Sequence, residues 1–266
     1  MKINKKIVDT TLRDGEQCPR VAFQPDDKIA LAKLLDQMGV YEIELGVFAK
    51  EHESYIVEEI MKQTEQAQIS VWSRLVEEDI RDIIALSPDR IHISIPVSYI
   101  QIYGKLKKNK DWIKNQLYQC INLIQRNNLM ITVGFEDASR ADISFCKSMA
   151  RFIWELGIDT IRIADTVGAF FPSNAKSFVQ SILEEAPLCI ETHEHNDLGM
   201  AVANTISMAN AGAQLLDCTL LGIGERAGNC NLRKLICASE HVFDFSIDKQ
   251  MLREAEEKLM NMIIEK

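Results

Sequence analysis

Short apolar runs alternate with longer segments of helical period along the whole chain. The short runs are rich in Val, Ile and Thr, as buried strands are, and the longer segments repeat apolar residues every three or four positions, as packed helices do. We expect strands at residues 7–11, 40–45, 69–74, 90–95, 130–135, 160–164, 188–192 and 214–219. We expect helices at residues 26–38, 54–63, 78–86, 112–126, 142–156, 174–184, 200–211 and 231–242.

Eight strand–helix units in succession predict an α/β protein of the (β/α)8 TIM barrel type. The chain shows no break in composition, so we expect one domain, with the catalytic barrel at residues 1–245 and a charged amphipathic helix at residues 246–266. An open doubly wound sheet is the alternative. Such a sheet more usually carries a glycine-rich phosphate turn after its first strand, and none is seen here.

Composition narrows the classes of partner. The net charge of −9 argues against nucleic acid as the main partner, although a local cluster of Arg and Lys is enough to bind an anionic substrate. No apolar run reaches the roughly 20 residues that span a bilayer, and the N-terminus lacks the apolar stretch of a signal peptide. The sequence therefore predicts a cytoplasmic protein that binds neither nucleic acid nor membrane.

The segment Glu191-Thr-His-Glu-His-Asn-Asp197 carries the strongest chemical signal. His193 and His195 stand two residues apart after an apolar run, and side chains at that spacing point to the same side of a strand. Two such imidazoles can hold one divalent cation, with the neighbouring carboxylates as further ligands or hydrogen-bond acceptors. The alternative is a pair of histidines that are simply hydrogen-bonded within the structure.

Unusual polar residues also follow most of the other expected strands. Taken singly, each is explained as a helix cap or a surface turn, but barrel enzymes place their active sites at the carboxyl ends of the strands. Together they predict one site, from residues 9–17, 74, 92, 136–140, 165–168 and 222–229. The basic run Lys105-Leu-Lys-Lys-Asn-Lys110 falls in the loop after the fourth strand, either as a solvated loop or over an anionic substrate.

Four motifs resemble those of a known family. Asp9-Thr-Thr-Leu-Arg-Asp-Gly-Glu-Gln17 resembles the signature of the 2-isopropylmalate, homocitrate and citramalate synthases, which are metal-dependent barrels that perform Claisen condensations. Residues 164–168, 193–197 and 222–229 match further motifs of that family in the same order. Ser94-Ile-Pro-Val-Ser98 and residues 135–142 are most similar to the homocitrate synthases of nitrogen fixation. The resemblance covers essentially the whole chain.

The resemblance implies roles for particular residues. The ligands of a divalent cation, Mg²⁺, Mn²⁺ or Zn²⁺, would be Asp14, His193 and His195, with Asn229 as a fourth or weak ligand. Arg13 would assist the ketone oxygen that the cation polarises, and Glu136 would take part in proton transfer. The residues expected to hold the 2-oxo acid are Gln17, Arg74, His92, Arg140 and Thr166. Arg74 and Arg140 suit a second carboxylate, as in 2-oxoglutarate.

The implied reaction is an acyl transfer that condenses acetyl-CoA with a 2-oxo acid. With 2-oxoglutarate as the acid, the product would be homocitrate. Synthases of this family usually continue past the barrel with a His-rich region, which we do not find before Lys266. We therefore expect either a homo-oligomer or a complex with a separate polypeptide that supplies that region. Leu221 also stands where the synthases commonly carry Asn.

Two other functions compete with the synthase. One is an aldolase-type lyase of the same superfamily, acting on a 3-hydroxy acid or a hydroxyacyl-CoA, which a barrel-only length favours. Residues 222–229 and 94–98 favour the synthase instead. The other is a barrel retained as a regulatory or structural partner, against which the intact ligands Asp14, His193 and His195 argue.

Overall fold

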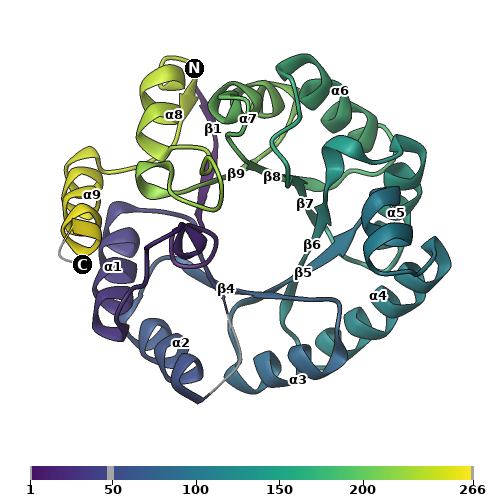
Figure 1. Cartoon of the computed structure of the whole chain (residues 1–266), viewed down its shortest axis with the longest axis horizontal. Helices are drawn as coiled ribbons and strands as arrows, with labels where there is room; N and C mark the ends of the chain where they lie inside the picture. Colours follow the sequence, from purple (N-terminus) through teal and green to yellow (C-terminus); the bar gives the residue numbers. More distant parts are fainter. Residues whose placement is uncertain (1, 47–50, 265–266) are drawn as a thin grey trace.

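The computed structural model describes residues 2–46 and 51–264, and it confirms the predicted barrel. Eight parallel strands close in sequence order, each paired with the next and the last with the first (Figure 1). The strands are β2 (Lys6–Asp9), β3 (Glu42–Gly46), β4 (Gln68–Ser73), β5 (Arg90–Pro96), β6 (Met130–Glu136), β7 (Thr160–Asp165), β8 (Cys189–Glu194) and β9 (Leu215–Cys218).

A ring of helices surrounds the strands (Figure 1). They are α1 (Pro25–Met38), α2 (Glu51–Gln63), α3 (Glu77–Leu86), α4 (Lys110–Gln125), α5 (Ile143–Glu155), α6 (Pro172–Leu183), α7 (Ala201–Ala211) and α8 (Leu232–Ser239). Pro25 begins α1 at a position where its missing N–H costs nothing, and Gly39 ends that helix at φ 91°. The C-terminal helix α9 (Lys249–Ile264) packs beside α1.

The strands alternate apolar and polar residues, and the two sets face opposite ways. On β5, Ile91, Ile93 and Ile95 belong to the buried apolar core, while Arg90 and His92 alternate with them. The cross-strand register aligns such polar positions around the barrel, so they share its interior. The apolar core is therefore the layer between strands and helices, and the interior is charged where many barrels carry branched aliphatic residues.

A small second sheet closes the base of the barrel. Strand β1 (Ile3–Asn4) pairs in parallel with β10 (Phe243–Asp244), which joins segments from both ends of the chain. Between β1 and β2, the Lys5 ammonium donates hydrogen bonds to the carbonyls of Ala209 and Ala213, at 2.9 and 2.5 Å. The sequence pattern did not predict this sheet, because two-residue strands have no detectable period.

Short helical turns follow four of the barrel strands at their carboxyl ends. They are η1 (Gly15–Gln17), the π-helical turn η2 (Ile100–Lys105), η3 (Ala138–Arg140) and η4 (Leu220–Gly222). Within η4, Leu221 has φ 58°, a left-handed conformation that Asn adopts far more readily than Leu. Across residues 2–46 and 51–264, no helix is both long enough and apolar enough to cross a bilayer.

Candidate active site

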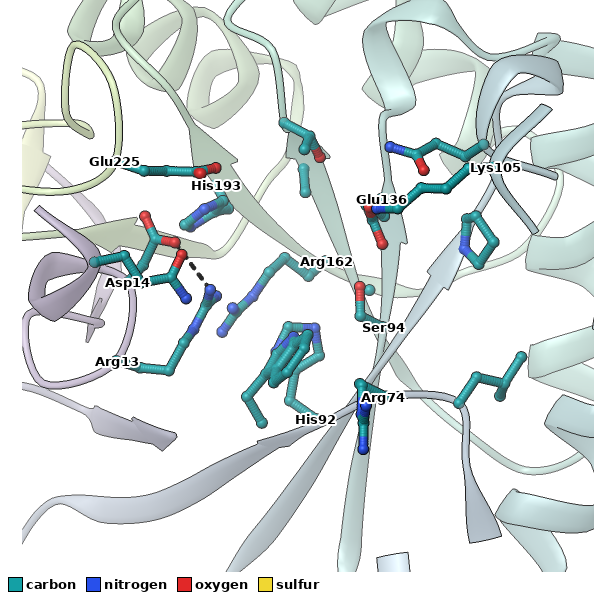
Figure 2. Close-up of a pocket in the computed structure, with 18 of the residues that line it drawn as sticks. Arg13, Asp14, Arg74, His92, Ser94, Lys105, Glu136, Arg162, His193 and Glu225 are labelled. Carbon is teal, nitrogen blue, oxygen red and sulfur yellow. Dashed lines mark hydrogen bonds and ion pairs between the residues drawn. The ribbon is translucent and has the colours of Figure 1, made fainter. Parts of the chain in front are cut away.

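A cavity of about 530 Å³ opens at the carboxyl ends of the strands (Figure 2). The sequence-predicted site residues that line it are Arg13, Asp14, Gln17, Arg74, His92, Glu136, Thr166, His193 and His195. Asn229 lies behind Asp14, and Arg140 does not line the cavity. Residues from six different strands or their following loops thus meet at one place, as expected for the catalytic face of a barrel.

Three of these side chains are arranged to hold a cation. One ligand atom each of Asp14, His193 and His195 lies within 4.8 Å of the others, and all three residues are buried. The two histidine Nε2 atoms are 3.2 Å apart, and His195 Nε2 is 3.8 Å from Asp14 Oδ2. Two nitrogens that bind one Zn²⁺ at about 2.1 Å lie about 3.0–3.4 Å apart, so the observed spacing fits a shared metal ion.

The charges of the three groups also suit a cation. Burial lowers the pKa of His193 to about 4, and burial together with His193 lowers the pKa of His195 to about 4. Both imidazoles are therefore neutral at pH 7 and have lone pairs to donate. Burial alone would raise the pKa of Asp14, but Arg13 and the two histidines lower it, so this carboxylate stays ionised.

Asn229 holds Asp14 in place. Its amide donates hydrogen bonds to Asp14 Oδ2 at 2.6 Å and to the Ile223 carbonyl at 3.0 Å, while its own Oδ1 is buried and has no hydrogen-bond partner among the residues that the structure describes. The loop from β9 passes close over this amide, since a Cβ on Gly224 would lie 2.2 Å from Asn229 Nδ2. Residues 222–229 are thus a packed part of the site, with a free amide oxygen as an additional acceptor.

A buried polar network around Arg162 supports the cluster from inside the barrel. Arg162, which is 1% exposed, donates to Glu191 at 2.7 Å and to Glu44 at 2.8 Å, and lies 3.4 Å from Asp217. Asp217 Oδ2 in turn is 3.0 Å from His193 Nδ1, within ion-pair distance but outside hydrogen-bond alignment. We did not predict this network from the sequence, although charged residues at alternate positions within apolar strands indicate it.

Glu44 connects this network to Arg13. Its carboxylate accepts hydrogen bonds from Arg13 Nε at 2.7 Å and from Arg162, and contacts His92 Nδ1 at 2.7 Å. Burial opposes ionisation of Glu44, but Arg162 and Arg13 outweigh it and hold its pKa well below the usual range. Arg13 also donates a hydrogen bond of 3.0 Å to Asp14, so its guanidinium is fixed beside the candidate metal ligands.

The His92 imidazole is held against a glycine. A Cβ on Gly134 would lie 2.2 Å from His92 Nε2, so only glycine leaves room for the ring in this orientation. Burial, followed by the charge of Arg162, lowers the pKa of His92 to about 3, which makes the ring neutral. With Nδ1–H directed to Glu44, Nε2 is buried against Gly134 and has no hydrogen-bond partner among the described residues.

Glu136 faces the cavity from the end of β6. Burial, followed by the neighbouring charges of Asp137 and Glu225, raises the pKa of Glu136 although Lys105 opposes the shift. Within the part of the chain that the structure describes, no hydrogen bond reaches this carboxylate. Figure 2 shows Glu136 across the cavity from Asp14 and His193. A carboxylate of raised pKa without a partner is suited to accept a proton from a substrate.

The two arginines expected to bind a second carboxylate are engaged elsewhere. Arg140 donates two hydrogen bonds of 2.8 Å to the fully buried Asp137, and it is not among the residues that line the cavity. Arg74 reaches the cavity mouth, but its side chain is 67% exposed and forms two hydrogen bonds to Asp79. The predicted role of Arg140 in holding the acid has no support in this geometry.

Gln17 and Thr166 lie where the sequence analysis expected them. Gln17 ends the turn η1, and Thr166 follows β7, and both line the cavity. The Thr166 hydroxyl accepts a hydrogen bond of 2.8 Å from the backbone N–H of Asp137. Arg226 pairs with its neighbour Glu225 at 2.7 Å and with Asp197, which fixes the loop after β9 over the site.

Three kinds of comparison agree with this picture. Residues 4–259 match the HMGL-like protein family. The homocitrate synthase subunit alpha of Clostridium pasteurianum is 41% identical over 231 residues, which cover 86% of each chain. The 2-isopropylmalate synthase 2 of Caldanaerobacter subterraneus is 37% identical over 94% of this chain and 66% of that protein.

Solved structures share the fold. An HMG-CoA lyase from Pseudomonas aeruginosa superimposes with a TM-score of 0.87 over 99% of this chain and 94% of its own, at 15% identity. An HMG-CoA lyase from Brucella melitensis gives 0.84 at 20% identity, over 98% and 99% of the two chains. At these identities the likeness concerns the fold alone. The family expected from the sequence motifs is confirmed: this chain belongs to the HMGL-like family, together with homocitrate and isopropylmalate synthases.

Proposed function

We propose that the protein is an acyltransferase that condenses acetyl-CoA with a 2-oxo acid and hydrolyses the thioester of the product. The observation that carries this proposal is the position of the Asp14, His193 and His195 cluster, which shares one cavity with Arg13 and with Glu136. Relatives named as homocitrate and isopropylmalate synthases support the same reaction class.

The residues around the cluster position and activate the acceptor. Asp14, His193 and His195 would hold a divalent cation, which when bound would supply Lewis-acid chemistry at the ketone oxygen of the 2-oxo acid. Arg13 lies beside Asp14 and adds a second positive group for the same oxygen. Because Glu44 already holds the guanidinium of Arg13 at 2.7 Å, little reorganisation is needed when charge develops.

Glu136 is the proposed base. It removes a proton from the acetyl methyl group, and the resulting enolate carbon forms a bond to the ketone carbon of the acceptor. The π electron pair of the ketone moves to its oxygen, which then takes up a proton from water. Water then attacks the thioester carbonyl, and CoA leaves as the thiol. The raised pKa of Glu136 brings its proton affinity closer to that of an efficient base at neutral pH.

The choice of acid depends on a cation that can face the acid's second carboxylate. Among the described residues, four cationic side chains line the cavity, and Arg13, Arg74 and Arg162 are each paired with a carboxylate. Lys105 has no carboxylate within 4.0 Å among the described residues, and Figure 2 places it beside Glu136. We assign the second carboxylate of 2-oxoglutarate to Lys105, with homocitrate as the product; a role in nitrogen fixation is part of this proposal.

A thiol-release assay tests the reaction. The protein is incubated with Mn²⁺, acetyl-CoA and, in turn, 2-oxoglutarate, 2-oxoisovalerate or pyruvate. We expect CoA release with 2-oxoglutarate above the other acids, and loss of that preference in Lys105→Met with turnover of the smaller acids retained. Cleavage of a hydroxyacyl-CoA without any acetyl-CoA turnover would instead establish the lyase alternative.

A second subunit belongs to the same proposal. The relative from Clostridium pasteurianum is named as a subunit alpha and matches 86% of its own length to this chain. We propose that this chain likewise acts with a partner polypeptide. The test compares turnover of the purified chain alone with turnover after co-expression with the product of the neighbouring gene. Full activity of the chain alone contradicts this part of the proposal.

A further inference from the structure

The segment at residues 99–110, named here the lysine loop, differs from the rest of the chain in charge. It contains η2 and carries Lys105, Lys107, Lys108 and Lys110 in a protein whose net charge is −9. Lys110 pairs with Asp142 at 3.4 Å. In the part of the chain that the structure describes, no carboxylate lies within 4.0 Å of the other three ammonium groups. Three exposed positive charges thus share a small surface without compensation.

The same loop exposes apolar and aromatic surface. Tyr99 and Tyr103 stack with their ring centres 5.6 Å apart at an interplanar angle of 18°, and they remain 50% and 46% exposed. Ile100 is 57% exposed and Leu106 is 41% exposed. Tyr99 is fixed by hydrogen bonds to Asp142 and from Lys110, so the stacked pair is held in place. Contiguous exposed apolar residues of this kind indicate a binding surface.

The lysine loop is continuous with the catalytic cavity. Gln101, Lys105, Leu106 and Trp112 all line that cavity, and Lys107 and Lys108 follow Leu106 directly along the chain. The Lys108 ammonium lies 5.2 Å from the centre of the Trp112 ring. The buried Ile102 anchors the turn in the core. A ligand that leaves the cavity over Leu106 and Trp112 therefore reaches a segment that carries both exposed lysines and exposed tyrosines.

We propose that the lysine loop binds the nucleotide end of acetyl-CoA. Lys107 and Lys108 contact its phosphates, the exposed ring of Tyr103 stacks on the adenine, and Leu106 and Trp112 lie along the pantetheine arm. Acetyl-CoA has this sequence of features: an acyl thioester that must enter the cavity, an amphipathic arm, and a phosphorylated adenosine. The identity of the ligand rests on the proposed function, and the location of its site rests on the loop.

Measuring CoA binding without turnover tests the proposed CoA site separately from the proposed condensing reaction. Calorimetry on the whole chain, without turnover, compares CoA, 3′-dephospho-CoA and pantetheine for wild type, for Lys107→Ala/Lys108→Ala and for Tyr103→Ala. We expect the double variant to weaken CoA binding about tenfold, since each exposed ion pair contributes at most about fivefold, and to leave pantetheine unchanged. Tyr103→Ala should weaken CoA and dephospho-CoA about equally, by about tenfold.

The control variant is Lys33→Ala/Lys176→Ala, which removes two exposed lysines from α1 and α6 and changes the net charge equally. Its CoA affinity should equal that of wild type. Equal losses in the two double variants, or losses that extend to pantetheine, overturn the site and point to general electrostatics or to misfolding. The protein could also bind CoA through the lysine loop and show no condensing activity. That result supports the site and rejects only the proposed function.

Discussion

At the scale of single residues, the site depends on close contacts that tolerate no added atom. Gly134 is the sharpest case, because His92 Nε2 occupies the place where a Cβ would stand. We predict that Gly134→Ala displaces the His92 ring and raises the KM for the 2-oxo acid at least tenfold, while metal binding is retained. Steady-state kinetics and metal titration measure the two effects.

The matched control is Gly104→Ala. A Cβ at Gly104 would meet nothing within 4 Å, and its backbone needs no positive φ. Its thermal stability and its KM for the acid should equal those of wild type. A Gly134→Ala enzyme with an unchanged KM would show that His92 has no part in binding the acid.

His193→Ala tests the metal cluster itself. Removing one of two imidazoles from a site with three strong ligands should weaken Mn²⁺ or Zn²⁺ binding by at least a hundredfold and abolish turnover. Metal content after dialysis and the thiol-release rate report the two effects. His241→Ala, at an exposed position, is the control. Unchanged metal content in His193→Ala would reject the site.

The neutral His92 makes stability depend on pH. Its folded pKa of about 3 lies below the ordinary value of 6.5, so between these values the unfolded chain binds a proton that the folded protein does not. Its stabilising contribution is therefore complete above pH 6.5 and is lost as the pH falls toward 3. We predict that wild type loses about 2 kcal/mol more than His92→Gln between pH 7 and pH 5 in urea unfolding.

Residue types with a characteristic spacing could be predicted, and solitary ones could not. The spacing of His193 and His195 indicates a metal site, and the motif around Asp14 indicates a further ligand. Glu44 and Arg162 stand alone inside apolar strands, where a sequence does not show which strands become neighbours. Arg140 pairs with Asp137, a buried carboxylate three residues earlier, and among the described residues no other cation lies within 4.0 Å of that carboxylate. The sequence alone does not show this pairing.

At the scale of the elements, Arg162 joins strands that are distant in sequence. From β7 it reaches Glu44 on β3, Glu191 on β8 and Asp217 on β9. We predict that Arg162→Met lowers the free energy of unfolding by about 3–5 kcal/mol, because it leaves buried carboxylates without a counter-charge. Arg74→Met, which breaks an exposed pair, should cost at most about 1 kcal/mol in the same urea titration.

The strands and helices could be predicted because each has many residues of one period. The expected eight units all exist, with bounds close to those observed. The sheet of β1 and β10 escaped notice because it is made of two-residue strands, and η2 because a π-helical turn has no distinctive sequence pattern. Such short strands form only by pairing with residues far away in the sequence. That pairing depends on the whole fold and leaves no local pattern.

At the scale of the whole molecule, a cation held by Asp14, His193 and His195 would couple metal binding to folding. Asp14 belongs to the first strand's loop and the histidines to β8, so a cation that binds all three favours the closed barrel over the unfolded chain. We predict that Mn²⁺ at a hundred times its Kd raises the free energy of unfolding by about 2.7 kcal/mol. A chelator should reverse the gain, and Asp14→Asn should show at most a small fraction of it. An equal gain in both proteins would place the stabilising ion elsewhere.

The separation between the apolar layer and the charged interior has a consequence for how new specificities arise. The isoleucines that hold β5 against the helices face away from the cavity, whereas Ser94 on the same strand faces it. Exchanges at mouth positions such as Ser94 or Trp72 therefore alter what the enzyme accepts while sparing the contacts that make it fold. A gene library varied only at such positions should yield mostly folded members, and selection among them would act on substrate preference alone.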